Sequence, residues 1–196
     1  MTKGRLEAFS DGVMAIIITI MVLELKVPHG GSFDDLKPLF PIFISYILSF
    51  IYLAIYWNNH HHMMQTVKHV TGKVLWANMH LLFWLSLIPF VTGWMGENHF
   101  TSASVFLYGV ILLGAAIAYF ILQKLIIKDH GKESILSKAL GKDLEGKISP
   151  ILYVLGIVSS FFNVWISGFL FVLVAIIWLI PDSRIEKALE KEKSNF

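Results

Sequence analysis

Charged and polar side chains stand at the start of the first long apolar stretch of the chain, where the available chemistry is ion pairing and hydrogen bonding. Arg5, Ser10 and Asp11 lead into an uncharged run that ends at Leu23. Together they give about 20 residues, the length at which a helix crosses a bilayer. Ionisable groups at membrane depth are expected to find partners, because leaving one unpaired in hydrocarbon costs several kcal/mol.

Partners for these side chains are available further along the sequence. Polar and interfacial residues occur where two later apolar segments reach the same membrane face: Trp57, Asn58, Asn59, His60, Trp76, Asn78 and His80. We therefore expect a polar cluster joining the first three membrane helices, with His60 and Asn78 as its partners from the second and third. The alternative is that each side chain extends separately to the lipid headgroups.

Three consecutive histidines, His60 to His62, are the obvious candidate for a metal site. Consecutive helix residues point about 100° apart, so three in a row cannot converge on one ion. The chain has no cysteine, and no carboxylate is spaced to help. We expect no metal site and no cofactor. No nucleophile is paired with a base and no nucleotide loop is present, so neither an enzyme nor a nucleic-acid partner is expected.

The composition excludes an ordinary soluble domain, because 56% of the 196 residues are hydrophobic and 15% are charged. The apolar segments predict an all-α polytopic membrane protein, one domain over residues 1–196, with a charged and solvated tail at 184–196. Pro89 predicts a kink in the third helix, and 151–180 is interpreted as a hairpin of two short helices. The six predicted helices are 6–27, 39–57, 74–94, 104–125, 148–162 and 164–180.

Basic residues give the orientation. With six crossings, all of the 16 lysines and arginines except Lys26 and Lys37 fall on the side of the N-terminus. The positive-inside rule then places both termini and the loop 127–149 in the cytoplasm. Within that loop, an apolar face predicts a short helix lying on the membrane surface. That face consists of Ile135, Leu136, Ala139 and Leu140.

The first helix has unequal faces. Advancing about 100° per residue from Arg5 places one stripe within roughly 60° of its direction. The stripe consists of Phe9, Gly12, Ile16, Thr19, Ile20 and Leu23. A lipid-facing or helix-packing surface explains such a stripe as well as a pore lining does.

The residues Arg5, Phe9, Ser10 and Asp11 spell R-x-x-x-F-S-D at the start of the first helix. This motif resembles the signature of the transmembrane protein 175 family, the lysosomal potassium channels and their bacterial homologues. The IIITIMVLELKVP segment that follows is similar to the bacterial branch. The resemblance implies a six-helix subunit, a homotetramer whose first helices line a central pore, and a potassium-permeable leak channel in the bacterial inner (plasma) membrane.

The same resemblance assigns roles on the first helix. Ile16, Ile20 and Leu23 match hydrophobic rings of the family's pore, with Ile16 at the narrowest point, and Thr19 matches a threonine linked to ion preference. Arg5, Ser10 and Asp11 match residues that do structural work with neighbouring helices. Potassium is then the permeant ion, selected without a carbonyl filter, because the two V-T-G fragments of the chain are incomplete filter signatures outside any pore loop.

The competing class is a proton-coupled secondary transporter. Such a carrier needs a relay of ionisable groups through the membrane, and inverted repeats usually accompany it. Between Asp11 and Glu24 the first helix offers only Thr19 as a polar side chain, and no repeat is apparent. A saturating, proton-linked flux would distinguish the carrier from the channel.

Overall fold

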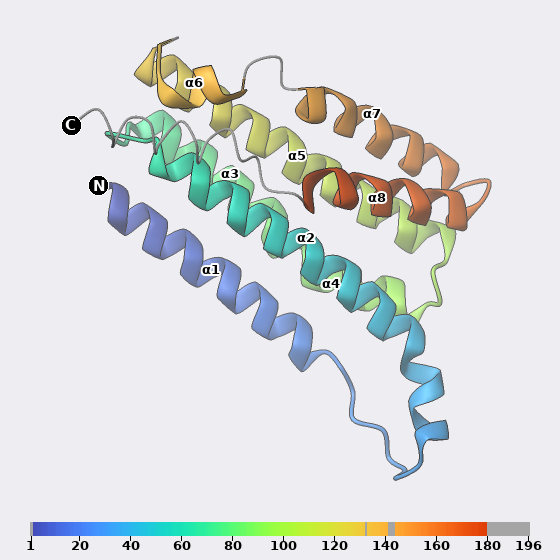
Figure 1. Ribbon diagram of the computed structural model, residues 1–196. Helices are drawn as coiled ribbons and strands as arrows, with labels where there is room; N and C mark the ends of the chain where they lie inside the picture. The colour runs from blue at the N-terminus through green and yellow to red at the C-terminus, as the bar shows by residue number, and fades with distance from the viewer. Residues whose placement is uncertain (1, 132, 141–143, 180–196) are drawn as a thin grey trace.

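Every regular element in the described part of the chain is helical. The computed structural model describes residues 2–131, 133–140 and 144–179. Figure 1 shows the long helices running side by side, with α6 at the same end of the bundle as the N-terminus. This confirms the predicted all-α class. The elements are α1 (Lys3–Leu23), η1 (Phe33–Leu39), α2 (Phe40–Gln65), α3 (Gly72–Ser86), α4 (Ile88–Glu97), α5 (Ser102–His130), α6 (Ile135–Leu140), α7 (Leu144–Ser159) and α8 (Val164–Leu179).

Four helical stretches are long and apolar enough to cross a membrane. They are Lys3–Leu23, Phe33–Gln65, Gly72–Glu97 and Ser102–His130. The helices α7 and α8 have 16 residues each. At 1.5 Å per residue each is about 24 Å long, less than the roughly 30 Å hydrocarbon core. They form a hairpin that packs against α5 and α2.

Several helix ends differ from those expected, and the end of α2 differs the most. The second helix was predicted to end at Trp57, but α2 continues to Gln65, so the three histidines lie inside a helix and not at its end. No proline or glycine interrupts that stretch, and its polar side chains are compatible with a helix that leaves the membrane core. In the third span, the predicted kink at Pro89 corresponds to a break at Leu87 between α3 and α4.

The loop between α5 and α7 contains the predicted short helix, α6. Its apolar face was expected to lie on the membrane surface, but it is mostly buried. Leu136, Ala139 and Leu140 are buried within the protein, so the apolar face of α6 packs on the bundle and not on lipid. Residues 180–196 lie outside the described part of the chain, and with them the predicted tail.

Close helix packing surrounds the middle of α5. Gly114 allows α3 to approach, because a Cβ atom at this position would lie 2.5 Å from ring atoms of Trp84. The pair α3 and α5 forms the central contact of the subunit, while α4 packs on α2 and α5. On the other side, α1 contacts α2, α3 and α4.

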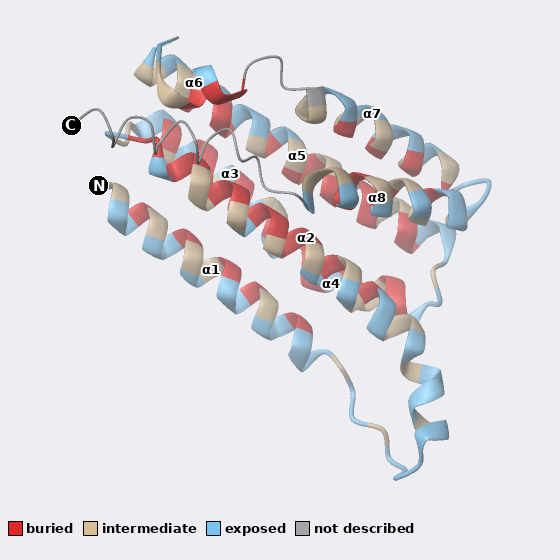
Figure 2. Cartoon of the chain, viewed as in Figure 1, coloured by how far each residue is buried: buried red, intermediate tan, exposed pale blue. Residues whose placement is uncertain are grey.

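Only one face of α1 takes part in this packing. Its buried residues recur every three or four positions, as expected for a helix with a single packed side. Figure 2 shows the buried and exposed faces alternating along α1. The buried residues are Leu6, Ser10, Met14, Ile17 and Met21.

Candidate functional site

The stripe singled out in the sequence lies on the face of α1 that points away from its own subunit. Ile16 is 60% exposed and Leu23 is 76% exposed, and Phe9 and Ile20 are also exposed. Thr19 is exposed as well, and its hydroxyl donates to the carbonyl oxygen of Ala15 at 2.9 Å. Because the hydroxyl proton is used within the helix, the oxygen lone pairs of Thr19 remain available to a cation or to water.

Behind this face, a chain of hydrogen bonds joins α1 to two other helices. The Asn78 side-chain amide of α3 donates to Ser10 Oγ of α1 at 2.9 Å. His60 Nε2 of α2 lies 2.8 Å from Asn78 Oδ1 and donates to it, because an amide oxygen only accepts. All three side chains are buried. The structure therefore brings together Ser10, His60 and Asn78, which we call the polar relay.

The relay also explains which way Ser10 faces. Its hydroxyl donates to Leu6 O at 2.9 Å, one turn back on α1, so its oxygen is left to accept from Asn78. The side-chain polar atoms of Ser10 and Asn78 therefore all have partners. Burial at membrane depth requires this. The relay fixes the rotation of α1 about its own axis and thus the direction of the exposed stripe.

The charged members of the motif lie outside the relay. Asp11 Oδ1 accepts a hydrogen bond from the Trp57 indole at 3.0 Å, a second link between α1 and α2. Arg5 is exposed, and it forms no hydrogen bond or ion pair with any described residue. Arg5 therefore does not join the relay within the described residues of one subunit, and its place in the cluster stays a prediction. The side chain is kept from the relay by its position on the outward stripe, about 120° from Asp11.

Two further expected partners have other contacts. Asn59 donates to Ile55 O at 2.9 Å within α2, and its own carbonyl accepts from the Tyr119 hydroxyl of α5 at 3.2 Å. His80 accepts from the Trp84 indole one turn later on α3. Neither reaches α1. Asn59 therefore bonds within α2 and to α5, and His80 bonds within α3.

Both ends of α1 are also fastened. The Lys3 ammonium donates to Gln65 O at the end of α2, at 3.0 Å. At the opposite end, Lys26 forms an ion pair with Glu97 at the end of α4. The hydrogen bond and charge of Glu97 raise the pKa of the exposed Lys26. These contacts leave α1 held along one side and at its two ends.

A second set of contacts closes the end of the bundle where α2 turns into α3. His130, the last residue of α5, accepts at Nε2 from the backbone amides of Lys68 at 3.0 Å and His69 at 3.4 Å. Its Nδ1 lies 3.0 Å from Ile126 O, to which it donates. Thr71, the N-cap of α3, donates to Asp129 at 2.5 Å. The end of α5 thus positions the start of α3, the helix that carries Asn78.

Sequence reasoning missed several of these contacts, although some had a signal. An indole N–H in a membrane segment needs an acceptor, and that signal points from Trp57 to an acid such as Asp11. The contacts of Lys3, Lys26 and His130 depend on helix ends that the sequence did not fix. Among the described residues, no three histidine, aspartate or glutamate side chains lie close enough to bind a metal ion.

Known proteins are similar to this chain over most of its length. A model of the family described as "Endosomal/lysosomal potassium channel TMEM175" matches residues 5–89. A protein of Chryseobacterium sp. (strain P1-3), named a potassium channel, is 59% identical over 97% of this chain and 100% of that protein. Another potassium channel, from Chamaesiphon minutus, is 33% identical over 87% of this chain and 90% of that protein.

A solved structure gives the same result for the fold. The crystal structure of a lysosomal potassium-selective channel TMEM175 homologue from Chamaesiphon minutus superposes with a TM-score of 0.80. It is 30% identical, and the match covers 92% of this chain and 97% of that one. Sequence, motif and architecture agree over nearly the full length. The chain belongs to the TMEM175 family.

Proposed function

We propose that this protein is a membrane-spanning potassium channel, and that its pore is formed by α1 of several subunits. Relatives named potassium channels match it over most of their length. The observation that supports the pore assignment is the apolar stripe of α1, which is exposed although the helix is held on its other side.

A homotetramer is the arrangement that the family resemblance implies for this helix. Four copies of the stripe around an axis would enclose a neck lined by rings of Ile16, Ile20 and Leu23, since cyclic symmetry repeats the same surface in each subunit. In this arrangement α7 and α8 are the fifth and sixth crossings, shortened and supported by α5 and α2. Arg5 would then stand at the entrance, where water or a neighbouring subunit supplies its partner.

Passage through an apolar neck depends on water. A ring of branched side chains favours dewetting, so an ion crosses only when the neck is wide enough to remain wet. An ion that enters must shed some of its water, and potassium holds its water less tightly than sodium. The hydroxyl oxygen of Thr19 adds one polar ring between the apolar ones. This mechanism gives modest selectivity for potassium without a carbonyl filter.

The polar relay has a separate role in this proposal. It fixes the rotation and tilt of α1, so it sets the neck radius without touching the ion. Substitutions in the relay are expected to alter assembly or opening, while substitutions in the stripe alter ion preference. The two groups of residues lie on opposite sides of the same helix.

The experiment is a reversal-potential measurement in planar bilayers with potassium and sodium on opposite sides. Ile16→Asn replaces an apolar ring with groups that hold water, so we expect higher conductance and weaker discrimination against sodium. Ile117→Asn on α5 is the matched control, because Ile117 is also an exposed isoleucine, at 46%, but lies on another helix. Ile17 is unsuitable as a control, since it is buried in the subunit.

Three outcomes would count against the proposal. A shifted reversal potential in Ile117→Asn but not in Ile16→Asn would remove α1 from the axis. A current that follows an imposed pH gradient and saturates with potassium concentration would favour the proton-coupled transporter. A pure sample that carries no current and no flux in any variant would contradict the channel itself.

Orientation is tested separately. We propose that both termini lie in the cytoplasm of a bacterium and the protein in its inner membrane, from the distribution of basic residues. The chain has no native cysteine, so Asn98→Cys and Glu133→Cys each introduce a single thiol. An impermeant reagent added to intact cells is expected to label the first variant only. Labelling of the second alone would reverse the orientation.

A further inference from the structure

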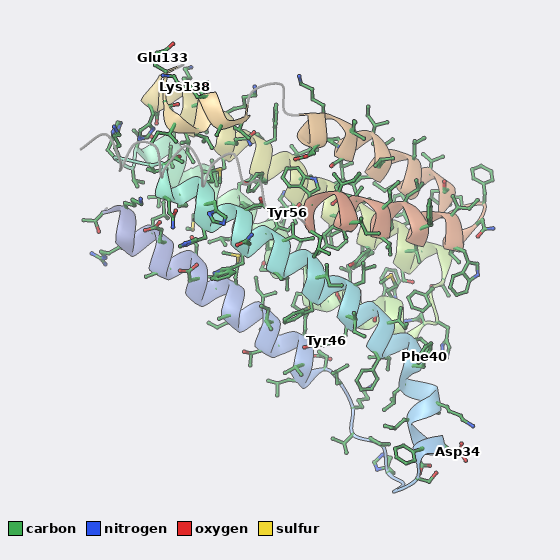
Figure 3. All side chains as sticks on the ribbon, viewed as in Figure 1. Asp34, Phe40, Tyr46, Tyr56, Glu133 and Lys138 are labelled. Atoms are coloured by element: carbon green, nitrogen blue, oxygen red, sulfur yellow. The ribbon has the colours of Figure 1, made fainter. Side chains whose placement is uncertain are left out.

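A cavity lies inside the subunit, away from α1, between the C-terminal halves of α2 and α5 and the α7–α8 hairpin. Its enclosed part holds about 50 Å³, and the space that includes its open mouth is about 580 Å³. Aromatic side chains from all four helices line the cavity. Figure 3 labels one of them, Tyr56, where α2 lies beside the end of α8. The wall includes Tyr52, Tyr56, Tyr119, Tyr153, Trp178 and Gln123.

Most polar atoms in this wall already have partners. The Tyr52 hydroxyl donates to Phe171 O at 2.6 Å, and the Trp178 indole donates to Ser149 Oγ at 2.7 Å. The Tyr119 hydroxyl donates to Asn59 O. These bonds fix the four helices relative to one another, so the space between them is part of the folded structure.

Gln123 and Tyr56 are exceptions. The Gln123 side chain is 4% exposed and lines the cavity, yet it has no hydrogen-bond partner among the described residues. Tyr56 lines the same space, is more than nine-tenths buried, and also has no hydrogen-bond partner in the described part of the chain. An amide and a phenol that line one open cavity without a protein partner are free to form hydrogen bonds with a molecule that enters it.

We propose that this cavity is a binding site for a small uncharged amphiphile with one hydroxyl group on a ring or short chain. No described lining residue carries a charge, so an ion would be desolvated without compensation. The aromatic wall suits an apolar body. The Gln123 amide supplies a donor and an acceptor to a single hydroxyl, and the Tyr56 hydroxyl adds a third contact.

A ligand bound in the cavity would affect the position of α1 through α2. Asn59 lines the cavity and is followed by His60, the α2 member of the polar relay. A ligand that braces this turn of α2 therefore acts two hydrogen bonds away from Ser10 of α1. The site is distinct from the ion pathway, and its existence does not depend on the proposed function.

The test is a fluorine-NMR titration of the purified full chain in detergent with 4-(trifluoromethyl)phenol. Detergent alone gives the baseline for partitioning. We expect saturable binding, weakened about tenfold by Gln123→Leu, which keeps the volume but removes the hydrogen bonds. Ala116→Phe, which fills the cavity from α5, is expected to abolish binding. Ile117→Leu, on the same helix but on its exposed face, should leave binding unchanged.

Two related probes examine the chemistry of the site. 1-Methyl-4-(trifluoromethyl)benzene lacks the hydroxyl, so it should bind more weakly and be insensitive to Gln123→Leu. 4-(Trifluoromethyl)benzoate is charged and should not bind. No saturation above the detergent baseline, binding unchanged in both cavity variants, or equal binding of the benzoate would each overturn the proposal. The first of these results would assign the unpaired atoms to water alone.

Discussion

Removing Asn78 tests whether the polar relay holds α1 in place. Asn78→Ala deletes two hydrogen bonds, one to Ser10 Oγ at 2.9 Å and one from His60 Nε2 at 2.8 Å. Inside membrane proteins such bonds average about 0.6 kcal/mol each and reach about 1.7 kcal/mol. His60, fully buried, then keeps a ring N–H without an acceptor, which costs about 1–3 kcal/mol. We expect a total loss of about 2–4 kcal/mol.

A double-mutant cycle separates the bond from the loss of volume. In Ser10→Ala the hydrogen bond to Leu6 O is also lost, but that carbonyl keeps its place in the helix, so we expect a cost of about 1 kcal/mol. If the two residues are coupled, Asn78→Ala should cost about 0.6–1 kcal/mol less in the Ser10→Ala background than in the wild type. The measurement is reversible unfolding in mixed detergent micelles, followed by circular dichroism.

Asn98 provides the matched control. Its side chain is exposed and makes a single hydrogen bond to Trp94 O, so Asn98→Ala should change the free energy of unfolding by less than about 0.5 kcal/mol. The reasoning is refuted if Asn78→Ala costs no more than Asn98→Ala. Additive single substitutions in the cycle, within about 0.3 kcal/mol, would show that Ser10 and Asn78 do not act together.

Two further predictions concern α5. Gly114→Ala places a methyl group against Trp84 and should destabilise the subunit by about 1–3 kcal/mol, whereas Gly93→Ala, with open space at its Cβ position, should be neutral or stabilising in the same thermal unfolding assay. His130→Ala removes the acceptor for two loop amides, so we expect hydrogen exchange at residues 66–71 to accelerate about tenfold, with partial recovery in His130→Gln. Equal exchange in the alanine variant and the wild type would contradict the assigned role of His130.

Much of the fold was predictable because membrane helices leave a strong hydrophobic signal. The helical class follows from apolar runs, and the outward stripe of α1 follows from its period. Helix ends were harder to predict, because residues outside the membrane need not be apolar. The hydrophobic pattern therefore fades where a helix leaves the membrane. The end of α2 is the example: polar residues after Trp57 suggested a stop, although a helix tolerates them.

For the site, the sequence identified types of residue better than pairs. Ser10, His60 and Asn78 were expected in one cluster, and the structure brings them together. Arg5 was expected with them because its charge needs a partner, but its direction on α1 takes it away. The Lys26–Glu97 ion pair joins residues that are separated by two membrane crossings, and no local pattern connects them.

The division of α1 into a packed face and an exposed face has a consequence for how the protein can vary. Ile17 and Met21 carry the stability of the subunit, whereas Ile16 and Leu23 contribute little to it because their side chains contact few residues of their own chain. Substitutions on the exposed face can therefore accumulate without unfolding the subunit, and in the proposed pore they would act on conduction and assembly instead. On that proposal, related channels can diverge in ion preference while a single scaffold is retained.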